Sequence, residues 1–482
     1  DPAGRLSFGE LDSTTHALAA ALLEAGVGKG NRVGLIMPNG TRWVQTAIAL
    51  TRIGAVLVPL STLLAPRELV AQLRGASVQY LVSVEEFRGH RYLDELKSEC
   101  RSPTDLPALR ELWTLDQLPR AAATTTSGVD NVTATVTPAD TLVIMFTSGS
   151  SGPPKGVIHS HGNALGAVGS GLAARCIDSE TRLYLPMPFF WVGGFGGGIL
   201  SALLAGATLV TEATPRLETT LRLLERERVT LYRGWPDQAE ALARQSESIG
   251  ADLCALRPGS LEALLPPEQR AAPGARAKLF GMTESFGPYC GNRADTDMPR
   301  SAWGSCGKPF AGTEVRIVDN DTGEPVPTGT IGIIQIRGPN TLRGICRRSR
   351  EDVFTVDGFY PTGDLGHLDD GGFLFYHGRS DDMFKVSGAT VYPSEVEQAL
   401  RTIDGVHNAF VTDVAGAVGA VVIADQTAGD LRAAARKLLS AFKVPTVWLL
   451  VDSDDAVPRG ATGKVDVAAL RQMMSVAPES DR

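Results

Sequence analysis

The residues with the clearest chemical potential lie in segment 141–157, which reads TLVIMFTSGSSGPPKGV. An apolar strand is expected at 141–146, and small, polar and basic residues follow it: Thr147, Ser148, Gly149, Ser150, Ser151, Gly152 and Lys155. Glycines let backbone N–H groups converge on an anion, hydroxyls add donors, and the lysine adds a mobile positive charge. The segment therefore predicts a phosphate-binding loop. It is not a Walker loop, because the spacing of that motif is absent and Pro153-Pro154 stand where its helix would start.

Four later segments also carry polar residues on expected turns: FGMTES at 280–285, YPTGDLG at 360–366, GRSDDMFKVSGATVYPSEVE at 378–397 and PRGATGK at 458–464. Glu284 follows Thr283, and a carboxylate beside a hydroxyl suits a hard cation held near phosphates. Asp364 offers two acceptor oxygens, which match the two hydroxyls of a ribose, and Arg379 can complete that contact. Taken alone, Lys464 would be an ordinary solvated lysine.

In this order, the five motifs resemble those of the adenylate-forming superfamily, which includes acyl-CoA synthetases, aryl-CoA ligases, luciferases and peptide-synthetase adenylation domains. The resemblance covers nearly the whole chain and is strongest to bacterial fatty-acid or acyl-CoA synthetases. It implies an ATP-dependent ligase that uses Mg²⁺ and coenzyme A. A carboxylate would attack the α-phosphate of ATP and release pyrophosphate, and the thiol of CoA would then attack the acyl adenylate and release AMP.

The resemblance also implies roles for individual residues. Glu284 is expected to hold Mg²⁺, and Lys464 is expected to stabilise the charge that develops as the carboxylate attacks. Thr283 is expected to donate to a phosphate. Adenosine contacts are implied for Gly281, Met282, Asp364 and Arg379. Asp381 occupies the hinge position, and the thiol step is implied to involve Lys385, Ser387 and Gly388.

The acyl pocket is expected in the apolar, glycine-rich run 189–204, and specifically at Phe189, Trp191, Gly193 and Gly194; this run lies within the uncharged stretch 183–211. The prolines and the glycine run in this stretch argue against a membrane helix, so no integral membrane segment is expected.

Trp191 stands where many acyl-CoA synthetases carry a histidine, and the usual adenine-contacting turn is replaced at 257–261. The aspartate that anchors an amino group in peptide-synthetase domains is absent from this region, which disfavours an amino-acid substrate. The apolar lining indicates a fatty or other apolar acid.

Three alternatives share these motifs. The first is a fatty acyl-AMP ligase that passes its adenylate to a carrier protein. The second is a catalytically silent nucleotide-binding scaffold, which the set of intact motif residues argues against. The third is luciferase-type oxidation, which the motifs do not exclude. A Ser/His/Asp hydrolase is not supported, because the sequence contains no nucleophile elbow.

Composition limits the kinds of partner that the protein is expected to bind. Lys and Arg number 46 against 54 Asp and Glu, so the net charge is −8, and no basic run indicates nucleic acid or a membrane surface. The six cysteines show no CxxC pair, which indicates reduced thiols in a cytoplasmic protein. His159 and His161 follow the expected phosphate loop; they are expected to be structural, and their position near the phosphates leaves a minor role there open. The chain opens with Asp1-Pro2 rather than Met, so a short preceding segment is expected, and no signal peptide can be read.

Helices and strands alternate in the first half of the chain. Ser7 and Glu10 form a capping box, and strands at 32–37, 55–60 and 78–84 alternate with helices at 41–52 and 66–75. This order predicts an α/β fold with doubly wound sheets. The Ala/Thr-rich segment 121–140 is expected to be a surface linker, a helix is expected at 199–204, and short strands are expected at 314–318 and 331–337.

The predicted domains are a large N-terminal domain at 1–380 and a smaller mobile α+β domain at 381–482. The first binds ATP and the acyl group and contains a β-rich subdomain at about 305–378. A second capping box, formed by Ser394 and Glu397, is expected to open a helix of the C-terminal domain.

Overall fold

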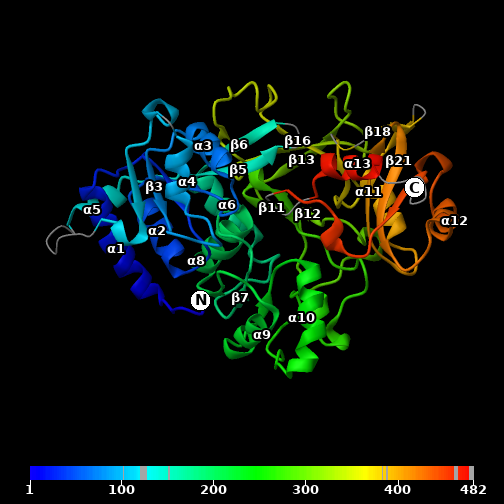
Figure 1. Ribbon diagram of the computed structural model, residues 1–482, viewed down its shortest axis with the longest axis horizontal. Coiled ribbons are helices and arrows are strands. Elements are labelled where there is room, and N and C mark those ends of the chain that lie inside the picture. Colours follow the sequence, from blue (N-terminus) through cyan, green and yellow to red (C-terminus); the bar gives the residue numbers. More distant parts are fainter. Residues whose placement is uncertain are drawn as a thin grey trace. The chain divides into compact units, whose positions relative to one another are not determined.

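The computed structural model describes residues 1–100, 102–119, 127–149, 152–380, 382, 384–386, 389–460 and 465–476. The chain divides into two compact units. The first comprises residues 1–315, 336–360 and 371–374, and the second comprises residues 316–335, 361–370 and 375–482. Figure 1 labels the elements along the chain.

A seven-stranded sheet is the framework of the first unit, with strand order β15-β6-β5-β2-β1-β3-β4. Its strands β1 to β5 pair in parallel, while β6 runs antiparallel to both β5 and β15. The strand bounds are β1 (Arg32–Ile36), β2 (Val56–Pro59), β3 (Tyr80–Ser83), β4 (Glu111–Thr114), β5 (Thr141–Gly149), β6 (Gly152–Ser160) and β15 (Gly344–Ile345).

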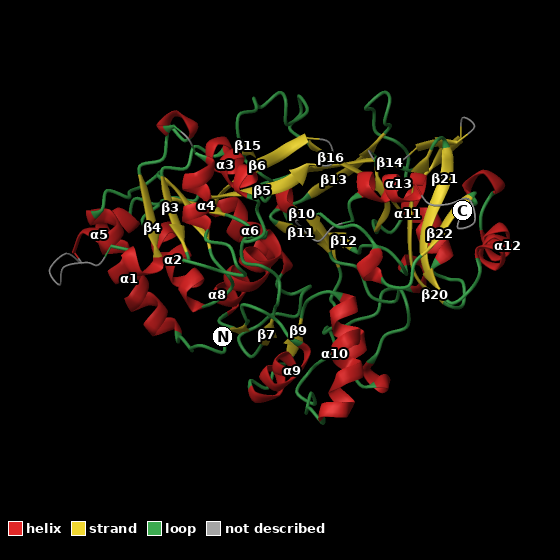
Figure 2. Cartoon of the chain, viewed as in Figure 1, coloured by secondary structure: helices red, strands yellow, loops and turns green. Residues whose placement is uncertain are grey.

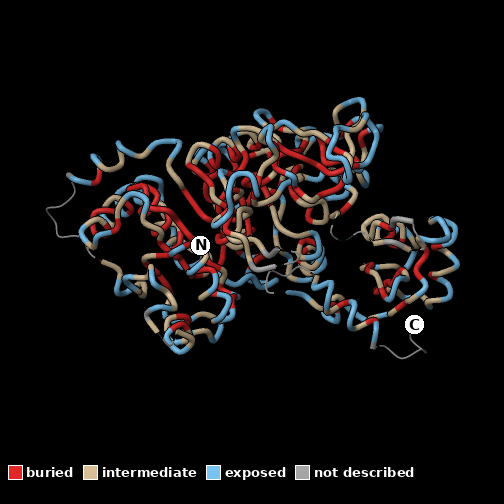
Figure 3. Tube along the Cα trace, turned by 90° about the horizontal axis from the view of Figure 1, so that it is seen from above, coloured by how far each residue is buried: buried red, intermediate tan, exposed pale blue. Residues whose placement is uncertain are grey.

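Helices cover both faces of this sheet, as the helix–strand alternation predicted. On β1, Val33 and Leu35 point into a core shared with α1 and α2, whereas Ile36 points into a core shared with α3 and α4. This alternation follows from the two-residue period of a strand. All residues of β2 and β3 are buried, and Figure 3 colours the buried residues of the chain red. The helices are α1 (Phe8–Glu24), α2 (Thr41–Arg52), α3 (Pro66–Gly75), α4 (Tyr92–Glu99), α5 (Ser127–Thr133) and α6 (His161–Gly171).

Two smaller sheets complete the first unit. The parallel sheet β8-β7-β9 consists of β8 (Thr208–Val210), β7 (Arg182–Tyr184) and β9 (Leu231–Tyr232). The antiparallel sheet β10-β11-β12 consists of β10 (Phe280–Met282), β11 (Gly287–Gly291) and β12 (Lys308–Pro309). The remaining helices are α7 (Val192–Gly194), the π-helix η3 (Phe195–Leu200), α8 (Ser201–Ala205), α9 (Leu217–Arg226) and α10 (Pro236–Ile249). Figure 2 shows α9 and α10 near β7 and β9.

The second unit is richer in strands. The sheet β13-β14-β16-β17 belongs mostly to it and consists of β13 (Glu314–Val318), β14 (Gly332–Arg337), β16 (Tyr360–Leu368) and β17 (Leu374–Arg379). The later elements are β18 (Phe384–Val386), β19 (Ala389–Val391), α11 (Pro393–Leu400), β20 (Val406–Val414), β21 (Ala417–Ala424), α12 (Ala428–Leu438), β22 (Val447–Leu450) and α13 (Val467–Val476). The strands β20-β21-β22 form one sheet around the buried Trp448.

Two local predictions were wrong, and one was incomplete. Segment 121–140 is not all linker, because α5 lies within it. Residues 199–204 are helical as predicted, but the first two belong to the π-helix η3, which begins at Phe195. Ser394 does not form a capping box. Pro393 takes the first helical position, which places Tyr392 at the N-cap, so the Ser394 hydroxyl donates to the carbonyl of His377.

The capping box at Ser7 and Glu10 is confirmed, since each residue's side chain accepts a hydrogen bond from the other's backbone N–H. The α/β fold class is also confirmed. The predicted boundary at 380/381 stays a prediction.

Candidate active site

The predicted phosphate-binding segment forms an antiparallel hairpin rather than a loop between a strand and a helix. Strands β5 and β6 pair along their length, and Thr147 lies opposite Lys155 (Figure 1). Ser150 and Ser151 lie outside the described residues, and the side chain of Ser148 is not described either. Gly149 is the last residue of β5, and Gly152 is the first residue of β6. The Lys155 side chain is half-buried and forms no ion pair with any described residue. Its positive charge is therefore available to an anion.

The FGMTES motif forms a strand followed by a tight turn. Gly281 lies on β10, where a Cβ atom would come within 2.0 Å of the carbonyl oxygen of Gly287, so only glycine allows this approach of β10 to β11. Met282 ends the strand, and residues Thr283–Ser285 form a single 3₁₀ turn. The turn closes at Phe286 in a left-handed conformation, with φ 52° and ψ 38°. For a bulky residue this conformation costs about 1–2 kcal/mol, so surrounding contacts must hold it.

Glu284 is a buried carboxylate with a single described hydrogen-bond donor. Its side-chain Oε1 accepts a hydrogen bond of 3.0 Å from the hydroxyl of Tyr360, and the residue is only 7% exposed. Oε2 has no hydrogen-bond partner, and the carboxylate has no ion pair, among the residues that the structure describes. A buried carboxylate without a cation fits Mg²⁺, which prefers oxygen ligands. No described group of three or more His, Cys, Asp or Glu residues could hold a metal ion, so further ligands would come from phosphate and water.

His159 links the hairpin to this turn, a connection that the sequence interpretation missed. It lies on β6, fully buried, and its Nε2 is 2.8 Å from the carbonyl oxygen of Thr283. The side-chain amide nitrogen of Asn163 lies 2.7 Å from its Nδ1. Burial lowers the pKa of His159 to about 4, so the ring is neutral, and these partners assign the proton to Nε2.

Asp364 and Arg379, both predicted to bind ribose, contact each other in the second unit. Arg379 donates from one nitrogen to Asp364 Oδ1 at 3.2 Å and to the carbonyl of Thr362 at 2.7 Å. Gly363 makes this possible, because a Cβ atom there would lie 2.7 Å from the guanidinium and the residue has a φ of +74°. The arginine thus fixes the turn that presents the aspartate.

The predicted acyl-pocket residues occupy different environments. Phe189 is fully buried and packs edge-on against Trp43. Gly194 is buried, and a Cβ atom there would lie 2.0 Å from the carbonyl oxygen of Pro188, whereas Gly193 would meet the flexible side chain of Met187. Trp191 is half-buried and meets Trp235 in a T-shaped contact with ring centroids 6.2 Å apart. This pair was not predicted from the sequence, because its partners come from separate elements.

A buried cation holds the glycine-rich helices in place. Arg175 donates to Ser201 Oγ at 2.9 Å, to the carbonyl of Val168 at 3.0 Å and to that of Gly197 at 3.5 Å. Burial and the neighbouring Arg233 lower its pKa to about 10. The π-helix η3 is therefore attached to the end of α6, and π-helices often mark functional sites.

Several predicted residues lie outside the described part of the chain: Asp381, Ser387, Gly388 and Lys464. The backbone of Lys385 belongs to β18, but its side chain is not described.

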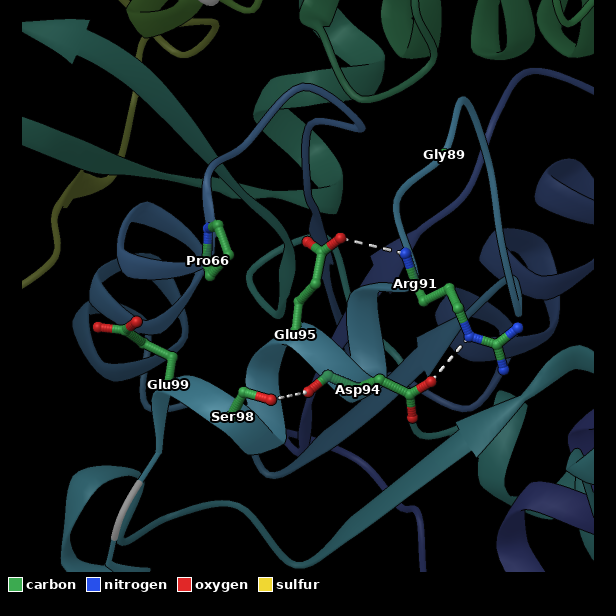
Figure 4. A pocket seen from close by; sticks show the side chains of 7 residues that line it. All are labelled: Pro66, Gly89, Arg91, Asp94, Glu95, Ser98 and Glu99. Atoms are coloured by element: carbon green, nitrogen blue, oxygen red, sulfur yellow. Dashed lines mark hydrogen bonds and ion pairs between the residues drawn. The ribbon is translucent and has the colours of Figure 1, made fainter.

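A surface hollow beside α3 and α4 is lined by Pro66, Gly89, Arg91, Asp94, Glu95, Ser98 and Glu99. Figure 4 shows that Arg91 donates from Nε to Asp94 at 2.8 Å and from its backbone N–H to Glu95 at 3.2 Å. None of the predicted site residues lines it, so it is separate from the candidate site. Among the described helices, none has the length and apolar character needed to cross a membrane.

Comparison with known proteins places the chain in a family. Residues 1–346 match the model of the AMP-binding enzyme family. A 3-[(3aS,4S,7aS)-7a-methyl-1,5-dioxo-octahydro-1H-inden-4-yl]propanoyl:CoA ligase of Mycobacterium tuberculosis is 32% identical over 97% of this chain and 94% of its own length. A feruloyl-CoA synthase of Amycolatopsis is 31% identical, covering 95% of this chain and 92% of its own.

Solved structures share the fold. The anthranilate CoA ligase AuaEII in complex with anthranoyl-AMP superposes with a TM-score of 0.80 at 24% identity, covering 98% of this chain and 93% of that one. ATP-bound MatB from Rhodopseudomonas palustris gives the same TM-score and identity over 98% of this chain and 95% of that one. The chain therefore belongs to the AMP-binding enzyme family, as an AMP-forming acyl-CoA ligase that requires ATP, Mg²⁺ and coenzyme A.

Proposed function

We propose that the chain activates an apolar carboxylic acid that carries a ring and transfers it to CoA. The observation that carries this proposal is the pair of Trp191 and Trp235, whose ring planes cross at 84° beside an uncharged, glycine-rich segment. Aromatic edges and faces bind flat rings through stacked and T-shaped contacts, which an extended alkyl chain cannot match. The names of the mycobacterial and Amycolatopsis relatives also refer to acids with rings. A fatty acid, the expectation from sequence, is the competing substrate.

In the first half-reaction, a carboxylate oxygen forms a bond to the α-phosphorus of ATP. The bond from that phosphorus to the bridging oxygen breaks, and pyrophosphate leaves with the electron pair. Lys155 and the backbone of the β5–β6 hairpin are proposed to hold the leaving phosphates, with the hydroxyl of Thr283 as a further donor. Mg²⁺ bound at Glu284 would offset the negative charge of the phosphates.

The ribose and the rest of the adenosine are proposed to be contacted by different motif residues. Asp364 accepts from the ribose hydroxyls, and Arg379, which already fixes the Asp364 carboxylate, supports that contact. Gly281 and Met282 lie on β10 directly before the Thr283–Glu284 turn, so their backbone is proposed to contact the adenosine. Lys464 is proposed to stabilise the charge that develops when the carboxylate attacks.

In the second half-reaction, the CoA sulfur forms a bond to the acyl carbon and the bond from that carbon to the AMP oxygen breaks. The thiol proton passes to solvent, and AMP leaves. Lys385, Ser387 and Gly388 are proposed to line the path of the thiol. The domain at 381–482 is proposed to turn about Asp381 between the two half-reactions.

The substrate is tested by the rate of pyrophosphate release with three acids of equal carbon count: an aryl-propanoic acid, a straight saturated acid and a dicarboxylic acid. We expect kcat/KM for the ring-bearing acid to exceed that for the straight acid by about 10-fold, the scale of discrimination in apolar pockets. An equal or reversed ratio would refute the ring preference. Trp235→Leu serves as the matched variant and should reduce the ratio.

The acceptor is tested separately. Free CoA and a phosphopantetheinylated carrier protein are each supplied with the preferred acid, and thioester formation is measured. We expect thioester with CoA. Product with the carrier alone would assign the chain to the acyl-AMP ligases, and failure of acid-dependent exchange of pyrophosphate into ATP would identify a silent scaffold.

A further inference from the structure

We infer that His159 is a positioning residue for ATP and Mg²⁺, acting through one hydrogen bond to the turn that carries Glu284. The inference rests on the proposed role of Glu284. The bond joins residues 124 positions apart in the chain, from the imidazole Nε2–H on β6 to the backbone carbonyl of Thr283 at 2.8 Å. That carbonyl belongs to the peptide unit that leads directly into Glu284.

The turn needs external support, because its own geometry is strained. Phe286 is left-handed although it is not glycine, and its N–H donates to the same Thr283 carbonyl at 3.0 Å. The His159 ring also packs edge-on against Phe286, with centroids 4.8 Å apart. His159 therefore holds the turn at both of its ends, through the hydrogen bond at Thr283 and through ring packing at Phe286.

A second residue sets the direction of the His159 hydrogen bond. Asn163 Nδ2 lies 2.7 Å from His159 Nδ1, so Nδ1 accepts and the proton must reside on Nε2. Asn163 is itself fixed, because its Oδ1 accepts from the N–H of Ser160 at 2.6 Å at the start of α6. Helix α6 thus orients a neutral imidazole, and the imidazole orients the turn.

The turn is also held at two other points. The backbone N–H of Leu342 donates to the carbonyl of Glu284 at 2.8 Å, and the Tyr360 hydroxyl donates to the Glu284 carboxylate at 3.0 Å. These contacts fix Glu284 itself and do not reach the preceding carbonyl of Thr283, which accepts from the Phe286 N–H within the turn. Only the His159 bond, among the described side chains, restrains the carbonyl of Thr283 from outside the turn. Since His159 and Lys155 both lie on β6, the bond also sets the turn relative to the phosphate hairpin.

The alternative is that His159 merely satisfies a buried polar site in the core. Two substitutions separate these roles. His159→Gln places an amide nitrogen near the position of Nε2 and can still donate to Thr283, but it loses the bond to Asn163. His159→Asn places its amide near Nδ1 and can still accept from Asn163, but it cannot reach Thr283. Both substitutions replace the imidazole ring by an amide, so both variants lose the packing of the ring.

The test measures MgATP affinity by titration calorimetry on the full chain, together with the thermal unfolding midpoint and the KM values for MgATP and acid. We expect His159→Asn to weaken MgATP binding by about 10-fold, the scale of one lost hydrogen bond at a buried site, and His159→Gln to bind within about 3-fold of the unsubstituted protein. The KM for the acid should not change in either. Equal MgATP affinities in the two variants would overturn the inference, as would failure of both to fold.

Glu284→Gln distinguishes this inference from the proposed function. If Glu284→Gln leaves MgATP affinity and the Mg²⁺ requirement unchanged, the proposed role of Glu284 fails. If Glu284→Gln shifts both while His159→Asn shifts neither, the role of Glu284 stands and the positioning role of His159 fails.

Discussion

Removal of the Tyr360 hydroxyl tests how the candidate metal ligand is held. Tyr360→Phe deletes one oxygen, keeps the ring and its edge-on contact with Phe354, and so leaves no large cavity. The lost hydrogen bond of 3.0 Å ends on a buried carboxylate. A hydrogen bond to a charged group contributes about 1.5–3 kcal/mol, which corresponds to about 10- to 100-fold in an equilibrium constant.

We expect Tyr360→Phe to raise the Mg²⁺ concentration for half-maximal adenylation by about 10- to 100-fold, the range found when a group that orients a metal ligand is removed. The assay is pyrophosphate release against Mg²⁺ concentration at fixed ATP. Glu284→Gln and the double variant complete a cycle, and the hydroxyl should have no further effect once the carboxylate is gone. An unchanged Mg²⁺ midpoint in folded Tyr360→Phe, beside a shifted one in Glu284→Gln, would refute the orienting role of the hydroxyl.

Four further outcomes are expected. Lys464→Ala should lower adenylate formation by about 10²- to 10³-fold and spare thioester formation from supplied acyl adenylate; equal loss in both half-reactions would contradict its assignment. Asp381→Pro should spare adenylation and strongly reduce the thiol step, and retention of both would remove Asp381 as the hinge. Trp191→Ala should change the preference among acids more than it changes the unfolding midpoint; the reverse would make Trp191 a core residue. The pKa of His159 is lowered from its ordinary 6.5 to about 4, so the unfolded chain binds a proton at this residue at a higher pH than the folded chain does. The contribution of His159 to the free energy of unfolding is therefore present above pH 6.5 and is lost as the pH falls toward 4. At pH 4.5 the free energy of unfolding is lower by about 2–3 kcal/mol from this residue alone. His159→Gln lacks this titration, so its free energy of unfolding should fall less between pH 7 and pH 4.5 than that of the unsubstituted protein. An equal fall in the two proteins would refute the effect of His159.

Much of the parallel sheet could be predicted from the sequence, because its signals are local. The helix at 41–52 has the predicted bounds, and the strand at 314–318 does too. Strand ends differ by one or two residues, as for β2, since hydrogen bonding to a neighbour decides where a strand stops.

Less of the candidate site than of the parallel sheet could be predicted from the sequence. Residue types and the family resemblance predicted roles for Glu284 and Asp364, and these roles stay predictions. The hydrogen-bond partners of the two carboxylates come from other elements, and Tyr360 is 76 positions from Glu284. Nothing near His159 in the sequence points to Thr283, and nothing near Trp191 points to Trp235. The hairpin at Lys155 was missed because Pro153-Pro154 were treated only as a helix block, although proline is also accepted near the end of a strand.

Most glycines of segment 192–200 cannot be replaced by a larger residue unless a neighbouring group moves. A methyl group at Gly194 would collide with backbone, at Gly198 with Leu185 at 2.8 Å, and at Gly196 with Phe286 at 3.0 Å. At Gly197 the nearest atom is an Arg175 nitrogen 3.8 Å away, which is ordinary contact. A methyl group at Gly197 would therefore fit without displacing a neighbouring atom, whereas one at Gly194 would require the backbone to move. Variant libraries that test the proposed acyl pocket should vary Gly197 and leave Gly194 unchanged.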